Sequence, residues 1–397
     1  MTEPVGRPAA LRRDATLVVT GGMSGMTMAL VAPALPGMVR QFADMPDIDL
    51  LARLVVALPT ALLAVAAPLA GWLADRTGRR RLLIAATALF MLAGLAPLVL
   101  DDLVAILASR ALLGGAMGVM YALAPALLGD WHDGPDRHRA MAWYGVGSAG
   151  GGAAMVIAGG ALAELGWRAP FALHIVALPL LLALVLWVRD VPRTPVVAVV
   201  ESVAKGRVPW LAVLGIYVMI AITGMAYMQM PLNLPFLFDE RAIGGPGFIG
   251  VALALSMLLQ SLGGFAFPRL ARRTSHAWIY GVVAGGVALG YLLLVLADGA
   301  VLALLALAVF GAGMSQMFPN SSTWLMSLTP SAMRARVLGG LVLSIYGGQF
   351  AAPFLLQPVV RAVGLAPAFI ALAALVAATG LAVILLGRRA SARKLND

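Results

Sequence analysis

The sequence contains no cysteine, few charged residues and few acids. The absence of cysteine from all 397 residues excludes disulfide bonds and thiolate metal sites. Only 12% of the residues are charged, whereas 61% are hydrophobic, and the mean hydropathy is +0.93. A water-soluble domain cannot carry that composition on its surface. The composition therefore excludes a soluble protein and indicates an integral membrane protein.

Titratable groups are especially scarce within the apolar segments. None of the 18 Asp and Glu residues lies inside an apolar run, and of the four histidines only His174 does. The net charge of +10 comes from Lys and Arg scattered through short segments, not gathered on one face or one helix. That distribution excludes a nucleic-acid-binding surface. Proton transfer within the membrane has few candidate groups.

Long apolar runs make up most of the chain. Each is near the roughly 20 residues that cross a hydrocarbon core of about 30 Å. Because lipid offers no partner to backbone N–H and C=O groups, such runs must be helices. Breaks at charged residues, Pro and Gly predict twelve spans, at 15–39, 52–74, 82–100, 103–128, 139–161, 169–188, 210–236, 247–268, 277–297, 300–326, 335–360 and 364–387.

The basic residues predict the orientation in the membrane. Most of the 28 Lys and Arg fall in alternate segments between the spans, beginning with the N-terminal one. By the positive-inside rule, both termini are then cytoplasmic, and we predict a multi-pass protein of a bacterial inner membrane. The first apolar stretch follows Arg12 and Arg13 and is too long for a signal-peptide core, so we expect it to be retained.

The two halves of the chain resemble each other. Gly71, Arg76, Arg79 and Arg80 recur 193 residues later as Gly264, Arg269, Arg272 and Arg273. A second set recurs 197 residues later, with Arg137, Arg139, Gly150 and Gly151 matching Arg334, Arg336, Gly347 and Gly348. Because an even number of spans separates the copies, the halves keep one orientation, as in parallel-repeat transporters.

The repeat and the longest connection divide the chain. We predict an N-terminal six-helix bundle over 1–190, a cytoplasmic linker over 191–209, and a C-terminal six-helix bundle over 210–397. The linker contains Pro, Lys and Arg but no span. The predicted fold is all-α, with twelve transmembrane helices in two pseudo-symmetric six-helix bundles.

The turn after the second span carries the strongest local motif. It reads Gly71-Trp72-Leu73-Ala74-Asp75-Arg76-Thr77-Gly78-Arg79-Arg80-Arg81. It resembles the signature Gly-x-Leu-Ala-Asp-Arg-x-Gly-Arg-Arg/Lys of the major facilitator superfamily. The resemblance covers the whole chain in length, span count and repeat, and implies an alternating-access transporter. It also implies gating residues, in which Asp75 pairs with neighbouring arginines in a cytoplasmic latch; we take them as Gly71, Asp75, Arg76, Gly78, Arg79 and Arg80.

Arg110 is the only charged residue placed well inside a predicted span. Its surroundings resemble the family's fourth-span motif Arg-x-x-Gln-Gly, although Leu113 stands where that motif has Gln. The resemblance implies a role for Arg110 in coupling or substrate binding; the alternative is a packing cation satisfied by backbone carbonyls. His174 and Asp14, at the mouth of the first span, are the other coupling candidates, and a packing role for His174 is equally open.

The fifth span ends in Gly159-Gly160, close to the family's connection between the fifth and sixth spans. Antiporters of the family place Gly-Pro shortly before this pair, where this chain has Met155 and Val156. The departure weakens the antiporter assignment. Gly145, Gly147 and Gly150 to Gly152 still allow close helix packing.

In this family the first, fourth, seventh and tenth helices line the central path. The resemblance therefore implies substrate-binding residues among their polar, aromatic and methionine side chains, joined by residues of the eleventh. The predicted set is Met26, Arg110, Tyr121, Tyr227, Gln229, Asn233, Gln316, Asn320, Trp324, Tyr346 and Gln349. Such side chains suit a bulky amphiphilic ligand, while helix-to-helix hydrogen bonds are the structural alternative.

We therefore expect an exporter of small amphiphilic organic compounds, of the multidrug type, with coupling to protons left open. The closest alternative is a facilitator or symporter that imports a small nutrient. If that nutrient is an anion, Arg110 is its counter-charge. A membrane-embedded enzyme would need a metal at Asp101-Asp102 or at His132, Asp133, Asp136 and His138, and side-by-side His and Asp are weak ligand evidence. We expect no enzyme activity, no cofactor and no metal, and a monomer in the bilayer.

Overall fold

The computed structural model describes residues 7–190 and 208–396, except for the side chains of Arg7, 24–29 and 389–396. Every element in this part of the chain is a helix. The described residues form two compact units: unit 1 holds those up to residue 190 together with Pro246–Val251, and unit 2 holds the rest. Residues 191–207 of the predicted linker lie outside the described residues, so its bounds stay a prediction.

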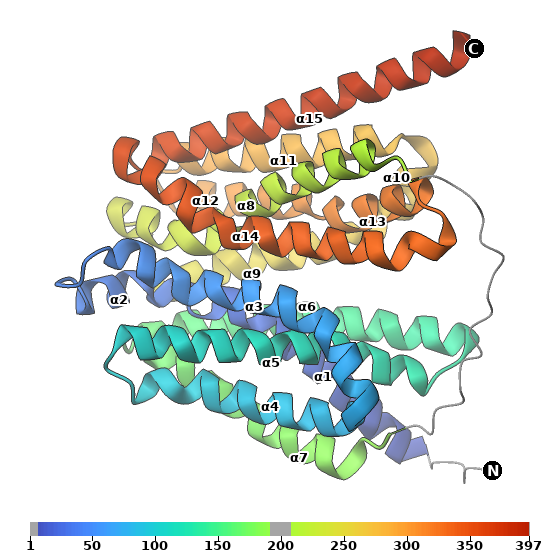
Figure 1. The fold of residues 1–397 in the computed structure, drawn as a ribbon. Helices are drawn as coiled ribbons and strands as arrows, with labels where there is room; N and C mark the ends of the chain where they lie inside the picture. The colour runs from blue at the N-terminus through green and yellow to red at the C-terminus, as the bar shows by residue number, and fades with distance from the viewer. Residues whose placement is uncertain (1–6, 191–207, 397) are drawn as a thin grey trace. The chain divides into compact units, whose positions relative to one another are not determined.

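Unit 1 consists of long helices joined by short turns and 3-10 segments (Figure 1). Asp102 is the N-cap of the helix α5 (Leu103–Asp130): its side chain accepts a hydrogen bond from the backbone N–H of Ala105 at 2.9 Å. The elements are α1 (Arg7–Leu30), η1 (Ala32–Ala34), α2 (Leu35–Gln41), α3 (Ile48–Thr77), α4 (Arg79–Leu95), η2 (Ala96–Leu98), α5 (Leu103–Asp130), α6 (Gly134–Ala163), η3 (Ala169–Val176) and α7 (Ala177–Trp187).

Unit 2 repeats this order of long helices and short turns. Ser275 begins α11 by accepting a hydrogen bond from the backbone N–H of Trp278. Helix α9 (Pro246–Gly263) begins in unit 1, and only the part after Val251 belongs to unit 2. The other elements are α8 (Trp210–Arg241), η4 (Gly264–Ala266), α10 (Phe267–Arg273), α11 (His276–Leu296), α12 (Ala300–Met314), α13 (Met317–Leu328), η5 (Ser331–Met333), α14 (Arg334–Val363) and α15 (Leu365–Asn396).

Eleven helical segments among the described residues are long and apolar enough to cross a membrane. They match the predicted spans from the second onward, so the all-helical membrane fold is confirmed, whereas the count of twelve is not reached. The predicted span 15–39 is not one continuous helix: α1 ends at Leu30, and a 3-10 turn containing Pro33 precedes α2. Proline lacks the N–H needed to continue the helix, which explains the break.

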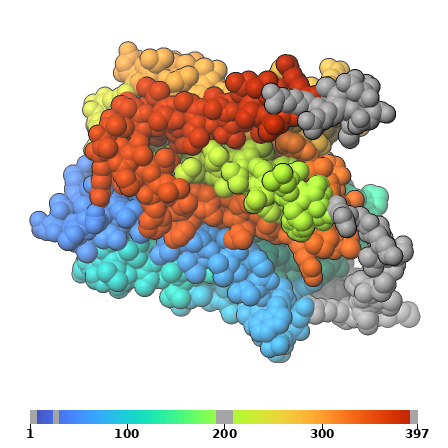
Figure 2. Space-filling model, turned by 45° about the horizontal axis from the view of Figure 1, so that its top comes forward, coloured from blue at the N-terminus to red at the C-terminus, as the bar shows by residue number. Residues whose placement is uncertain are grey.

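The outer surfaces of the helices are apolar. In unit 2, α8 and α15 both reach the surface in Figure 2, and Leu211 on α8 is 86% exposed. Leu214 on α8 and Leu381 and Leu385 on α15 are exposed as well. Large exposed apolar patches are rare on soluble monomers, but they suit a surface that faces lipid.

Glycines allow matching helix crossings in the two units. In unit 1, α1 meets α6 so closely that a Cβ on Gly22 would lie 3.3 Å from Cα of Gly151. In unit 2, α8 meets α14, and a Cβ on Gly348 would lie 2.1 Å from the carbonyl oxygen of Ala221. Gly151 and Gly348 belong to the repeat 197 residues apart. Gly151 and Gly348 therefore serve backbone approach, the usual role of small residues between membrane helices.

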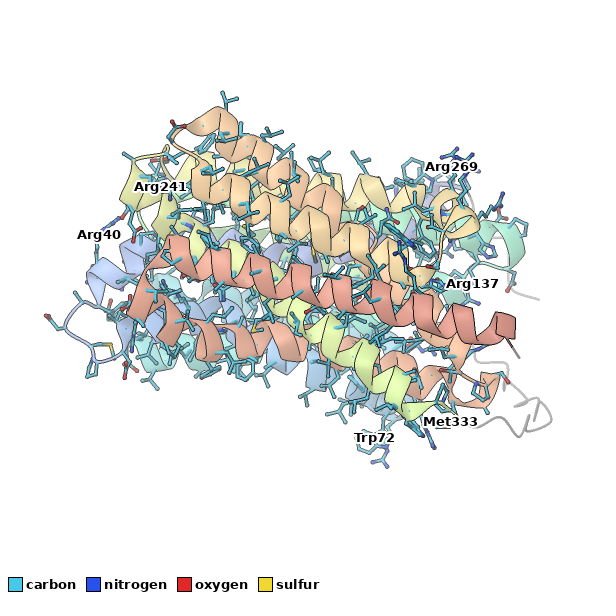
Figure 3. All side chains as sticks on the ribbon, turned by 90° about the horizontal axis from the view of Figure 1, so that it is seen from above. Arg40, Trp72, Arg137, Arg241, Arg269 and Met333 are labelled. Atoms are coloured by element: carbon cyan, nitrogen blue, oxygen red, sulfur yellow. The ribbon has the colours of Figure 1, made fainter. Side chains whose placement is uncertain are left out.

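Arginines bind the exposed carbonyls at one end of each unit. In unit 1, Arg168 donates to the carbonyl oxygen of Leu100 at 3.2 Å. In unit 2, Arg241 donates to the carbonyls of Val295, in the last turn of α11, and of Ala297, just after it, each at 2.8 Å. Figure 3 labels Arg241 and Arg269 at opposite ends of unit 2. A cation at a helix C-terminus satisfies carbonyls that lack an intrahelical partner.

Candidate functional site

The predicted gating residues surround the turn between α3 and α4. Gly78 separates the helices with φ of 89°. Arg80 then joins the start of α4 to the end of α7: its Nε donates to the carbonyl of Val188 at 2.5 Å, and its Nη2 donates to that of Val185 at 2.7 Å. Its backbone N–H donates to Oδ1 of Asp190 at 2.9 Å. Arg80 therefore holds the turn against α7, where the helix dipole favours a cation.

A small cavity lies beside this turn. Arg79 forms a salt bridge with Asp130, the last residue of α5, and both side chains are about one third exposed. The cavity has a volume of about 260 Å³ and is lined by Ala74, Asp75, Gly78, Arg79, Leu127, Asp130 and Asp190. Asp75, Gly78 and Arg79 thus come together there, whereas the guanidinium of Arg76 stacks 4.0 Å from the ring centroid of Trp72.

The two glycines of this motif should respond differently to alanine. Gly78 has a positive φ, and a Cβ there would also lie 3.3 Å from Oδ2 of Asp190. Gly71 lies inside α3 with nothing within 4 Å of its Cβ position. We expect Gly78→Ala to cost about 1 to 2 kcal/mol of stability and Gly71→Ala to be neutral or slightly stabilising. Thermal unfolding of the purified protein measures both, and equal effects would contradict the assignment.

Arg110 lies inside unit 1 with 1% of its surface exposed. Its Nη2 donates to the carbonyls of Ala93 and Gly94 at the end of α4. The guanidinium carbon lies 5.1 Å from the ring centroid of Phe171. Pro97 follows in η2 and has no N–H to donate to Ala93, four residues earlier, so Arg110 supplies the missing donor. Its Nε and Nη1 have no hydrogen-bond partner among the described residues, so the backbone carbonyls satisfy the guanidinium only in part. Its role in coupling or binding stays a prediction.

His174 lies next to Arg110 and is fully buried. Its Nδ1 lies 2.9 Å from the carbonyl oxygen of Phe171, and its ring centroid is 5.3 Å from that of Phe90. Gly94 provides the space, since a Cβ there would lie 2.1 Å from the imidazole. Two coupling candidates, Arg110 and His174, therefore contact the same Phe171.

Asp14, the third coupling candidate, contacts two basic side chains. Nε of Arg13 donates to its Oδ1 at 2.8 Å, and Nε2 of His132 lies 2.9 Å from its Oδ2. His138 instead approaches the carbonyl of Gly134 in its own helix. Among the residues that the structure describes, no three His, Asp or Glu side chains are grouped as a metal site would require. The sequence did not predict the contact between Asp14 and His132, which lie far apart in the chain.

The predicted binding residues on α8 include a buried amide pair. Gln229 and Asn233 are 2% and 1% exposed, and Nδ2 of Asn233 donates to Oε1 of Gln229 one turn away. Pro231 and Pro235 lie in this helix, so two carbonyls of α8 lose their usual donors. Tyr227 stacks on Phe310, with 6.4 Å between ring centroids.

A second group forms where α13 meets the start of α11. Asn320 is fully buried, its Oδ1 lies 2.8 Å from Nδ1 of His276, and its Nδ2 donates to the His276 carbonyl at 3.0 Å. The ring of Trp324 stacks on His276 at 5.8 Å between centroids. His276 thus connects two predicted residues, although it is not among the predicted binding residues itself. A polar residue at the start of a span was the only available signal.

The remaining predicted residues are dispersed. Gln316 donates through Nε2 to the carbonyl of Gly263 at 2.6 Å. Gln349 on α14 is 4% exposed, whereas Tyr121 on α5 is 40% exposed. Tyr346 is half-buried. The side chain of Met26 lies outside the described residues.

Comparison with known proteins identifies the family. The pattern of the Major Facilitator Superfamily matches residues 17–353, most of the chain. The tetracycline resistance protein, class C, of Escherichia coli is 30% identical over 305 residues, which cover 72% of this chain and 74% of that protein. Matches over this share of the chain are enough to show which family the chain belongs to.

Solved structures show the same fold. The peptide transporter POT in complex with sulfate has a TM-score of 0.74 at 15% identity and covers 95% of this chain and 94% of its own. A mutant of the nucleoside transporter NupG has a TM-score of 0.73 at 14% identity, covering 95% and 99%. The xylose transporter XylE from E. coli has 0.71 at 15%, covering 96% and 99%. The chain has eleven membrane-length helices among the residues that the structure describes and carries the signature turn, and it is a multi-pass membrane transporter that belongs to the major facilitator superfamily.

Proposed function

We propose that the protein is an alternating-access exporter of small amphiphilic organic compounds in a bacterial inner membrane, with both termini in the cytoplasm. Family membership supports secondary transport in general. The relative from E. coli is named a tetracycline resistance protein, and this supports export of an organic compound in particular. The excess of basic residues in alternate segments supports the orientation.

Buried amide groups in unit 2 carry the proposal. Within the described part of the chain, Nε2 of Gln229, Oε1 of Gln316 and Oε1 of Gln349 are buried and have no hydrogen-bond partner. An unpaired buried polar atom costs about 1 to 3 kcal/mol, so such atoms need a reason to persist. A ligand with hydroxyl, carbonyl or amide groups provides one at any of these positions, because such groups pair with an amide N–H or C=O.

The neighbouring side chains suit an apolar ligand body. Met228 and Met230 are buried beside Gln229 on α8, and methionine adapts its shape to varied ligands. We propose as substrate-binding residues the set predicted from the sequence: Met26, Arg110, Tyr121, Tyr227, Gln229, Asn233, Gln316, Asn320, Trp324, Tyr346 and Gln349.

Gating and coupling form the second part of the proposal. We propose two six-helix bundles, over 1–190 and 210–397. The turn with Asp75, Gly78 and Arg79, beside Asp130, acts as a cytoplasmic latch that holds one alternating-access state. Salt bridges of this exposure are weak, about 0 to 1 kcal/mol, which suits a contact that must break in every cycle. Protons are the proposed coupling ion, with Asp14, Arg110 and His174 as the candidate groups.

Import of a small anion is the alternative reading, and it requires Arg110 as counter-charge. Arg110 is 1% exposed, and its Nη2 donates to α4 carbonyls. Its Nε and Nη1 are buried without a hydrogen-bond partner among the described residues, and these two donors are what favours an anion. The scarcity of acids within the apolar runs is the feature that favours uncoupled import.

Transport by reconstituted protein tests the proposal. We expect proteoliposomes with an acidic interior to accumulate several-fold more tetracycline or ethidium than protein-free liposomes do. This accumulation should stop when an ionophore collapses the pH gradient. Gln229→Leu should lower the rate about tenfold, as loss of one hydrogen bond to a ligand does. Gln260→Leu, a half-buried glutamine outside the proposed set, is the matched control. Accumulation of xylose, a nucleoside or a dipeptide, but of neither amphiphile, would refute export.

A further inference from the structure

Unit 1 contains a cavity of about 600 Å³ between the first part of α1 and the first part of α6. Its lining side chains recur every three or four residues on each helix, so they share one face of each. From α1 they are Leu11, Asp14, Ala15 and Val18; from α6 they are Asp136, Arg139, Ala140 and Trp143; Leu128 and His132 complete the lining. The volume lies within the range of about 300 to 1,000 Å³ typical of small-molecule sites.

The walls are mainly apolar. Leucine, valine and alanine side chains form most of the surface, and Trp143, which also lines the cavity, is 59% exposed. An exposed indole offers a flat face on which an aromatic ligand can stack, with ring centroids about 4.5 to 7 Å apart. The body of a fitting ligand is therefore apolar and aromatic.

The charges divide into an occupied set and a free pair. Asp14 already accepts from Arg13 and contacts His132. Asp136 and Arg139 are exposed, and neither makes a hydrogen bond or a salt bridge with any described residue. They lie three residues apart on one face of α6, where side chains start about 5 to 6 Å from each other. The cavity thus presents one free anion and one free cation above an apolar floor.

We propose that this cavity binds a zwitterionic amphiphile, with its ammonium group at Asp136, its anionic group at Arg139 and its aromatic body against Trp143. A ligand with a single charge would pair with one of these residues and bring a like charge toward the other. A zwitterion pairs with both. The proposal rests on the proposed export function: the cavity lies at the end of unit 1 that the basic residues place in the cytoplasm, where an exporter collects its substrate.

Three fluorescent probes with one aromatic body and different charges test the charge preference. Nε-dansyl-lysine is a zwitterion, dansylcadaverine a cation and dansylglycine an anion. Dansyl anisotropy with the full chain in lipid nanodiscs, corrected with empty nanodiscs, gives each Kd. We expect the zwitterion to bind about tenfold more tightly than either singly charged probe, since each charge-assisted hydrogen bond adds that order of affinity. Equal affinities for the three probes would overturn the proposal.

Neutral substitutions locate the site. We expect Asp136→Asn and Arg139→Gln each to raise the Kd of dansyl-lysine about tenfold. Asp136→Asn should also improve dansylglycine binding, and Arg139→Gln that of dansylcadaverine. Asp133→Asn removes an exposed acid one turn away that does not line the cavity, and it should change nothing. All three positions are exposed, so thermal unfolding should stay near that of the wild type. Unchanged binding in both cavity variants would overturn the proposal.

Transport of the same probes separates this proposal from the proposed function. If the wild type binds dansyl-lysine through Asp136 and Arg139 but transports no amphiphile, the site stands and the export function fails. If the wild type exports dansyl-lysine while both variants bind it as the wild type does, export stands and the site fails.

Discussion

Replacing Gly114 with valine is expected to abolish stable folding of unit 1. A Cβ at this position would lie 2.4 Å from the carbonyl oxygen and 2.6 Å from Cα of Pro59 in α3. Both are main-chain atoms of a long helix, so no side-chain rotation relieves the contact. Overpacking usually costs about 1 to 3 kcal/mol, and we expect Gly114→Val to exceed this because α5 and α3 must separate. Gly114→Ala should fall within that range.

The adjacent glycine provides a matched control. Gly115 has nothing within 4 Å of its Cβ position. Gly115→Val adds the same volume one residue further along α5, and it should change stability by less than about 0.5 kcal/mol. Yield of monodisperse protein and thermal unfolding temperature report both variants. A Gly114→Val protein as stable as the Gly115→Val protein would contradict the crossing geometry.

The repeat extends this prediction to unit 2. Gly311 lies 197 residues after Gly114, and a Cβ there would lie 2.2 Å from the carbonyl oxygen of Ser256 in α9. The same helix crossing therefore occurs in both units, and Gly311→Val should be as damaging as Gly114→Val. Gly114 and Gly311 thus share the 197-residue spacing of the second repeat.

The sequence was sufficient to predict where most helices run. Apolar runs determine membrane spans because the bilayer leaves the backbone no alternative to a helix. It was less informative about where spans are interrupted. Pro33 ends the first helix early, whereas Pro59 and Pro68 are tolerated inside α3. A proline is tolerated where packing compensates for the lost hydrogen bond, and packing depends on partners that are distant in sequence.

In the candidate site, too, local motifs could be predicted from the sequence, whereas contacts between distant segments could not. The signature turn with Asp75 and Arg79 was recognisable because its residues are consecutive. Its partners were not: Arg80 binds the end of α7 more than 100 residues later, and His276 binds Asn320 on another helix. Such contacts arise only when the helices pack. The depth of Arg110 in its span could likewise be predicted, but the carbonyls toward which it points could not.

Arg110→Met is expected to destabilise unit 1 through the backbone of α4. Arg110 supplies the donor that Pro97 cannot, so its loss leaves the carbonyl of Ala93 buried without a partner. An unsatisfied buried acceptor costs about 1 to 3 kcal/mol. Arg110→Glu should be worse, about 3 to 5 kcal/mol or loss of folded protein, because it buries an anion beside carbonyl oxygens. Thermal unfolding of the purified variants measures the order.

Pro97→Ala provides the decisive comparison, because alanine restores a backbone N–H four residues after Ala93. If Arg110 acts through that carbonyl, adding Pro97→Ala to Arg110→Met should recover about 1 kcal/mol, whereas Pro97→Ala alone should gain less. A coupling role predicts a different pattern: Arg110→Met would then keep wild-type stability and lose transport, and Pro97→Ala would restore neither. The interaction energy between the two substitutions therefore distinguishes a structural arginine from a transporting one, even though it sits at the family's fourth-span motif.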